Sequence, residues 1–178
     1  MSETYHLNIF KCKLCEEVIF AEHKSSTCPF CGAHDNYIIL AKDWEQTNNS
    51  DIFSKNERNN LEKALELERR SVRFYKCSIS HTNNAKLHAI FKGLLRIKTE
   101  HILLLSKILK IQKANTDIQN ICFRLDYENI ETAIKNEKES EKFYIDSYNK
   151  ATEKRIKEIF LELAEIEKDH IKLFEDDF

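Results

Sequence analysis

The chain has 178 residues, 42% of them hydrophobic, enough for one substantial core and one small additional module. Only 2 glycines and 1 proline accompany 33% charged residues, so the composition predicts long helices rather than strands joined by tight turns. A net charge of -2, with both signs mixed along the chain, excludes a basic surface for nucleic acid or membrane. Because no signal-peptide pattern or apolar span is present, we expect a soluble, cytoplasmic protein.

The chain divides into three parts by composition. Residues 1–42 contain the only proline and the β-type stretches 18–20 and 37–40, which predict a small β domain. Residues 43–58 are polar and aperiodic, as in a linker. From residue 59 to 178, apolar residues recur at helical spacing in four runs, which predict four long helices.

Four cysteines in the first part form two C-x-x-C elements, separated by twelve residues, and the second reads C-P-x-C-G. Four thiolates at this spacing predict a tetrahedral Zn²⁺ or Fe site. The ligands are Cys12, Cys15, Cys28 and Cys31. This stretch resembles rubredoxin-like domains, but Glu16 follows the first element where that family usually has glycine. Iron and zinc therefore both remain open at this site.

The other cysteines and most histidines show no ligand spacing. We expect Cys77 and Cys122 to be buried as small apolar side chains. Five histidines are expected at the surface without a role: His6, His23, His34, His81 and His88.

The helical part contains an internal repeat. Residues 61–109 align without a gap on residues 130–178, which indicates a duplicated helical hairpin. The alignment pairs Glu68 with Glu137, Tyr75 with Tyr144 and His101 with His170. About twenty residues, from Lys110 to Asn129, separate the two copies. That length suits a crossover along the bundle, as in ferritin-like folds.

Metal-ligating side chains recur on the predicted inner faces. A dinuclear site in a bundle needs a carboxylate from each of two helices and Glu-x-x-His from each of the other two, because residues three apart share a face. The fourth helix supplies Glu167 and His170 at that spacing. The candidates on the first and third helices are Glu68, Tyr75, Glu137 and Tyr144. Their coincidence under the repeat favours a metal site over separate solvated charges.

With these residues, the chain resembles a rubrerythrin with its rubredoxin-like domain at the N-terminus, over nearly the whole length. The segments that carry the resemblance are 64–68 with Phe74-Tyr75, and 163–170. It implies a mostly α protein: a ferritin-like four-helix bundle with a small N-terminal rubredoxin-like β domain of zinc-ribbon type. It also implies a catalytic set in which Glu68 and His101 hold one iron, Glu137 and His170 hold the other, Glu167 bridges them, and Tyr75 and Tyr144 donate hydrogen bonds to the ligands.

The second helix departs from this pattern at Lys98, which aligns with Glu167 where a second bridging glutamate belongs. Its side chain could turn outward and leave a weaker site, or its ammonium could enter the core and replace part of the metal charge. Three carboxylates and one ammonium leave two negative charges, enough for one divalent ion. On this count the half-site of Glu137, Glu167 and His170 is expected to survive.

The resemblance implies reduction of hydrogen peroxide by the bundle irons, with electrons relayed through the tetracysteine iron from an external reductase, in a homodimer. A second hypothesis is a degenerate ferritin-like scaffold or binding protein with a structural tetracysteine zinc and a mononuclear or empty bundle site. Oxidase or iron-storage chemistry is a third possibility, because bundles of this kind support several reactions.

Overall fold

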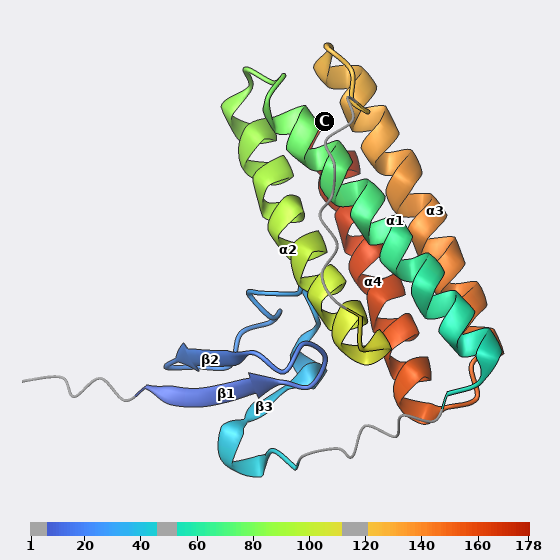
Figure 1. Cartoon of the computed structure of the whole chain (residues 1–178). Helices are drawn as coiled ribbons and strands as arrows, with labels where there is room; N and C mark the ends of the chain where they lie inside the picture. The colour runs from blue at the N-terminus through green and yellow to red at the C-terminus, as the bar shows by residue number, and fades with distance from the viewer. Residues whose placement is uncertain (1–6, 46–52, 112–120) are drawn as a thin grey trace, which may run out of the picture.

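The structure is a computed structural model, and it describes residues 7–45, 53–111 and 121–178. These residues form a small three-stranded sheet followed by four long helices, as Figure 1 shows. This confirms the fold class predicted from the sequence, a ferritin-like bundle with a small N-terminal β module.

The N-terminal module is built on three antiparallel strands: β1 (Asn8–Cys12), β2 (Val18–Ala21) and β3 (Ile38–Leu40). The strand order is β2-β1-β3, with Phe10 opposite Ile19 on one side and Leu40 on the other. Two single turns of 3₁₀ helix flank β3, at Asp35–Tyr37 and Ala41–Asp43. The sequence predicted β2 and β3, whereas the central strand β1 was not anticipated.

The bundle consists of α1 (Lys55–Ile79), α2 (Ala85–Leu109), α3 (Asp126–Lys150) and α4 (Lys154–Asp177). α1 begins within the segment predicted as linker, because Ser54 and Glu57 form a capping box at its N-terminus. Asn84 caps α2 through its side chain. The apolar faces of all four helices turn inward, as the helical periodicity predicted.

The helices pack as two antiparallel hairpins, α1 with α2 and α3 with α4. α2 ends beside the N-terminal module, where Lys107 pairs with Glu16, whereas the segment before α3 lies at the opposite end of the bundle. The end of α2 and the start of α3 therefore lie at opposite ends of the bundle. Most of the predicted crossover, residues 112–120, lies outside the described residues.

A disulfide joins Cys77, at the C-terminal end of α1, to Cys122, just before α3. The prediction that both cysteines are merely small apolar side chains was wrong. Cys77 is buried, as expected, but Cys122 is half-buried and lies against it. The two are 45 residues apart in sequence, so no local spacing indicated their pairing.

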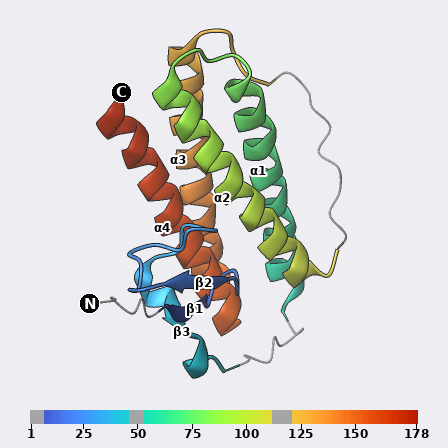
Figure 2. The same ribbon diagram turned by 90° about the vertical axis from the view of Figure 1, so that its left-hand side faces the viewer.

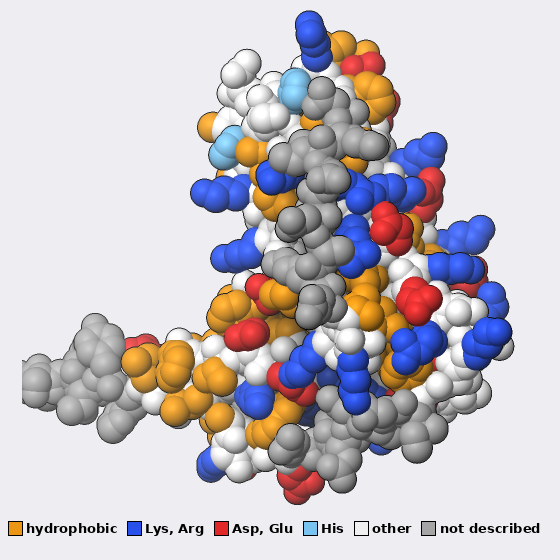
Figure 3. Space-filling model, in the orientation of Figure 1, with side chains coloured by type: hydrophobic (Ala, Val, Ile, Leu, Met, Phe, Trp, Pro, Cys, Tyr) orange, Lys and Arg blue, Asp and Glu red, His pale blue; other side chains and the backbone are white. Residues whose placement is uncertain are grey.

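One hydrophobic cluster runs from the N-terminal module into the bundle, and it contains Phe10 and Leu14 together with Leu61, Leu105 and Ile159. Figures 1 and 2 both place the sheet beside α4 and the C-terminal half of α2. On the face shown in Figure 3, positive side chains and fewer negative ones are mixed over the helices, while apolar side chains gather over the β1–β2 hairpin.

Candidate metal centres

Two similar turns hold the four cysteines. The Glu16 amide donates to the carbonyl of Cys12 at 2.9 Å, and the Gly32 amide donates to the carbonyl of Cys28 at 3.0 Å. Both residues have positive φ, 67° at Glu16 and 81° at Gly32. Glycine adopts this conformation freely, whereas a side chain such as that of Glu16 costs about 1–2 kcal/mol. The departure from the rubredoxin-like pattern is thus accommodated without a change of turn.

The sulfur atoms are spaced for a metal ion. Cys12 Sγ lies 3.8 Å from Cys31 Sγ, and Cys15 Sγ lies 3.8 Å from Cys28 Sγ. All four sulfurs lie within 4.8 Å of one another. A tetrahedral site with metal–sulfur bonds of about 2.3 Å places its sulfurs about 3.8 Å apart, so the donor set fits tetrahedral Zn²⁺ or Fe.

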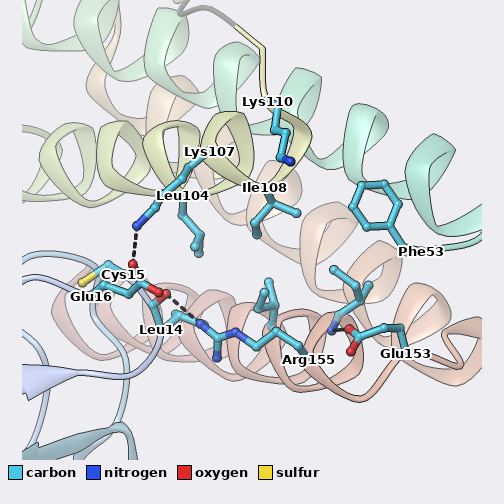
Figure 4. Close-up of a pocket in the computed structure, with 12 residues that line it drawn as sticks. Leu14, Cys15, Glu16, Phe53, Leu104, Lys107, Ile108, Lys110, Glu153 and Arg155 are labelled. Carbon is cyan, nitrogen blue, oxygen red and sulfur yellow. Dashed lines mark hydrogen bonds and ion pairs between the residues drawn. The ribbon is translucent and has the colours of Figure 1, made fainter. Parts of the chain in front are cut away.

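A cavity of about 370 Å³ opens beside Cys15, between the N-terminal module and the ends of α2 and α4 (Figure 4). Its wall is mostly apolar, with Leu104 and Ile108 from α2 facing Leu14 across it. Basic side chains stand at its edge, where Lys107 pairs with Glu16 and Arg155 donates to the carbonyl of Leu14 at 3.1 Å. Cys15 is the most exposed cysteine of the four, and this cavity opens beside it.

The predicted bundle ligands converge in the core. Each of the seven is less than one-tenth exposed, although they come from four different helices: Glu68, Tyr75, His101, Glu137, Tyr144, Glu167 and His170. The ligand residues form two groups, and within each group the ligand atoms lie within 4.8 Å of one another. One comprises Glu68, His101 and Glu167, and the other comprises Glu137, Glu167 and His170.

The tyrosines cross between the two copies of the repeat. Tyr75 on α1 donates its hydroxyl to Glu137 on α3, and Tyr144 on α3 donates to Glu68 on α1 at 2.6 Å. Burial, and then the nearby carboxylates, raise the pKa of both tyrosines well above the ordinary value. Both hydroxyls therefore keep their protons and serve as hydrogen-bond donors to the carboxylates.

Lys98 lies in the middle of this cluster. Its side chain is fully buried, and its Nζ lies 2.6 Å from Glu137 Oε2 and within hydrogen-bonding distance of Glu167 Oε2. A third carboxylate oxygen, Glu68 Oε2, is 3.8 Å away. Of the two arrangements that the sequence allowed, the structure thus shows the ammonium inside the core.

The electrostatics of the cluster follow from this placement. Burial lowers the pKa of Lys98, but the carboxylates of Glu137, Glu167 and Glu68 outweigh it and raise that pKa, so the ammonium stays charged. Burial also acts to raise the pKa of Glu137, yet the ammonium holds it well below the ordinary value. Burial, followed by the Glu137 carboxylate, raises the pKa of Glu167 well above the ordinary value. One ammonium therefore does not suffice to keep all three carboxyls ionised.

These residues do not fit a pair of metal ions. The ammonium contacts the same oxygens of Glu137 and Glu167 that would bind an ion together with His170. The position aligned with Glu167 supplies no second bridging carboxylate, because Lys98 occupies it. A dinuclear centre would need Lys98 to leave the core and a further ligand to replace it.

A hydrogen bond joins the two centres directly. His101 Nε2 lies 2.8 Å from the carbonyl oxygen of Cys31, and His101 Nδ1 lies 3.1 Å from Glu68 Oε1. A ligand of the tetracysteine site is thus connected to the bundle carboxylates through a single imidazole of the same chain.

Other contacts between the N-terminal module and α4 were not predicted from the sequence. The backbone amide of His34 donates to Glu162 Oε1 at 2.6 Å, and its ring contacts both Glu162 and Asp169. Burial lowers the pKa of His34, but Glu162 and Asp169 raise it overall. Glu162 and Asp169 are seven residues apart on α4, and only the fold brings the distant His34 to them.

Residues 128–177, which span most of α3 and α4, match the Rubrerythrin family. The match covers Glu137, Glu167 and His170, and it confirms the resemblance inferred from the sequence. It supports a non-haem iron protein. No curated protein and no solved structure matches the chain. None of the helices within the described residues has the length and apolar character needed to cross a membrane.

Proposed function

We propose that this rubrerythrin-like chain is a non-haem iron redox protein that reduces hydrogen peroxide. The observation that carries the proposal is the hydrogen bond between Cys31 and His101, which connects a four-thiolate site to a buried carboxylate cluster within one chain. Iron held by four thiolates supplies electrons one at a time. Each peroxide takes two electrons and two protons and yields two water molecules, so two deliveries are needed per turnover.

The residues of the chain have separate tasks in this proposal. Cys12, Cys15, Cys28 and Cys31 hold the iron, and the cavity beside Cys15 receives the external electron donor. His101 connects the iron module to the cluster, with one ring nitrogen beside the Cys31 carbonyl and the other beside Glu68. Tyr75, Tyr144 and Lys98 are the buried hydrogen-bond donors that face the carboxylates.

A second function is favoured by a specific observation, the ion pairing of Lys98 with Glu137 and Glu167. An ammonium in this position stabilises the carboxylates without any metal. In that case the protein would be a scaffold or binding protein with structural zinc at the tetracysteine site.

Metal analysis and oxidation by peroxide distinguish the iron redox protein from the zinc scaffold. We expect iron in the tetracysteine site, and we expect hydrogen peroxide to reoxidise the anaerobically reduced protein with one peroxide consumed per two electrons. The ferric-thiolate absorption provides the readout. Zinc in place of iron, or no reoxidation by peroxide, would support the scaffold.

The role of His101 is tested with a matched pair of variants on α2. His101→Leu removes the connection to Cys31, and we expect reoxidation by peroxide to slow by about 10–100-fold. His88→Leu changes an exposed histidine on the same helix and should leave the rate unchanged. Equal rates in the two variants would show that peroxide oxidises the tetracysteine iron without the bundle.

A further inference from the structure

The bundle centre is asymmetric although its residues come from a repeat. On the side of Glu137 and His170, the carboxylate oxygens have donors: Lys98 Nζ contacts Glu137 Oε2 and Glu167 Oε2, and His170 Nδ1 lies 3.2 Å from Glu167 Oε2. The ammonium therefore takes the place of a cation on this side.

The side of Glu68 lacks such donors. Glu68 Oε2 and Glu167 Oε1 are buried and receive no hydrogen bond from any described residue. The residues are 1% and 0% exposed, respectively, so bulk water does not solvate these oxygens. Lys98 Nζ is 3.8 Å from Glu68 Oε2, too far for a hydrogen bond. Buried carboxylate oxygens without a donor are rare in folded proteins, and a bound ion is one of the groups that account for them.

A ring nitrogen of His101 also faces the carboxylates on this side of the centre. The Cys31 carbonyl can only accept a hydrogen bond, so His101 Nε2, 2.8 Å away, carries the proton. In the neutral ring, Nδ1 then presents its lone pair toward Glu68, whose Oε1 already accepts from Tyr144. A histidine that donates one ring N–H to a backbone carbonyl is typical of a metal ligand. A proton on Nδ1 would still leave both open oxygens without a donor.

Charge also favours a single ion. When all three carboxyls are ionised, as metal ligands are, they and the ammonium leave two negative charges in a core that excludes water, and one divalent ion neutralises them. A second divalent ion would give the centre two positive charges. The ligand atoms of Glu68, His101 and Glu167 lie within 4.8 Å of one another, so small movements bring them to the spacing of about 3–4 Å around a transition metal.

We propose that the bundle binds one divalent transition-metal ion through Glu68, Glu167 and His101, with the Lys98 ammonium in place of the second ion of a dinuclear site. Glu167 then bridges the metal and the ammonium through its two oxygens. One imidazole and two carboxylates suit Fe²⁺, Mn²⁺ or Zn²⁺ and leave coordination positions for an exogenous ligand. This assignment deepens the proposed function, but it does not depend on peroxide being the oxidant.

The test is the iron stoichiometry of full-length protein in which the tetracysteine site is filled with zinc. Anaerobic titration with Fe²⁺, followed by removal of free metal and elemental analysis, should give about one iron in addition to about one zinc per chain. No bound iron, or about two irons, would overturn the proposal.

The repeat supplies matched controls. We expect Glu68→Gln and His101→Gln to weaken Fe²⁺ binding by at least about 100-fold, whereas His170→Gln retains the ion. If His101→Gln retained the iron and His170→Gln lost it, the ion would lie on the side of Glu137 and His170, which would refute the assignment. Circular dichroism of each variant verifies that the bundle is folded, and either Glu68→Gln or His101→Gln alone decides the question.

A gain of metal provides an independent check. Lys98→Glu restores the carboxylate that the repeat predicts, and we expect about two irons per chain in this variant. An unchanged single iron would contradict the role given to the ammonium. If the iron stoichiometries hold but peroxide does not oxidise the protein, the site assignment stands and the proposed reaction fails.

Discussion

The Lys98 ammonium acts electrostatically as a bound cation that cannot dissociate. Its Nζ is surrounded by carboxylates from three helices, Glu68 on α1, Glu137 on α3 and Glu167 on α4. Because the side chain is fully buried, removing it would leave these acids in a low-dielectric core without compensation. The bundle therefore depends on Lys98 for stability whenever no metal replaces its charge.

We predict that Lys98→Met lowers the free energy of unfolding by about 3–5 kcal/mol in protein that holds only one zinc per chain, in the tetracysteine site, and no iron. Methionine preserves most of the volume, so the loss measures the charge. Urea unfolding monitored by helical circular dichroism gives the value. Lys168→Met, at an exposed lysine of α4, should change stability by less than about 0.5 kcal/mol. Similar effects of the two substitutions would show that Lys98 does not compensate the carboxylates.

The sequence predicted which residues meet in the bundle core, because the repeat aligned Glu68 with Glu137 and His101 with His170. It could not decide where the Lys98 ammonium lies, since a long side chain can reach either the core or the surface from one backbone position. It also gave no sign that His34 contacts Glu162, because that pair depends on how the module docks.

At the scale of elements, Glu57 joins two helix termini. Its carboxylate accepts from the Ser54 amide at 2.7 Å in the capping box of α1, and from the amides of Thr152 and Glu153 at 2.7 Å and 2.8 Å in the α3–α4 turn. Burial acts to raise the pKa of Glu57, but these backbone hydrogen bonds lower it to about 2. One side chain thus ties the start of α1, in the first hairpin, to the turn of the second hairpin.

We predict that Glu57→Gln destabilises the protein by about 2–3 kcal/mol at pH 7. Because the folded-state pKa lies below the unfolded value, this stabilisation is present above about pH 4.5 and is lost as the pH falls toward 2. Urea unfolding across pH 2–7 should therefore show the wild type and the variant converging in acid. Glu62→Gln, at an exposed position of α1, should follow the wild type at every pH. A pH-independent difference would mean that the carboxylate charge is not what stabilises the turn.

The four helices were predictable because their apolar residues repeat at helical spacing over long stretches. β1 was not, since its sequence Asn8–Cys12 mixes polar and apolar residues and becomes a strand by pairing with both β2 and β3. The disulfide between Cys77 and Cys122 was likewise not predicted, because the two cysteines are 45 residues apart and no local spacing pairs them.

For the whole molecule, the N-terminal module depends on both its metal site and the bundle. Residues 7–45 form a unit too small to bury a large core of its own, and chains of this size usually require a metal or disulfides to fold. Phe10 and Leu14 share a cluster with residues of the bundle, and His34 binds α4. The bundle, in contrast, has its own second cluster around Phe74 and Phe91.

We predict that removing the tetracysteine metal unfolds the N-terminal module and leaves the helices folded, because the four thiolates otherwise repel and lose their common ligand. The only tryptophan, Trp44, follows β3, and Lys11 lies 3.9 Å above its ring, so its fluorescence reports the module. Circular dichroism reports the helices. Chelation should change the fluorescence while the helical signal falls only slightly, and zinc should restore both. A parallel loss of the two signals would show instead that the shared cluster makes module and bundle one cooperative unit, in which the tetracysteine metal stabilises the bundle site as well.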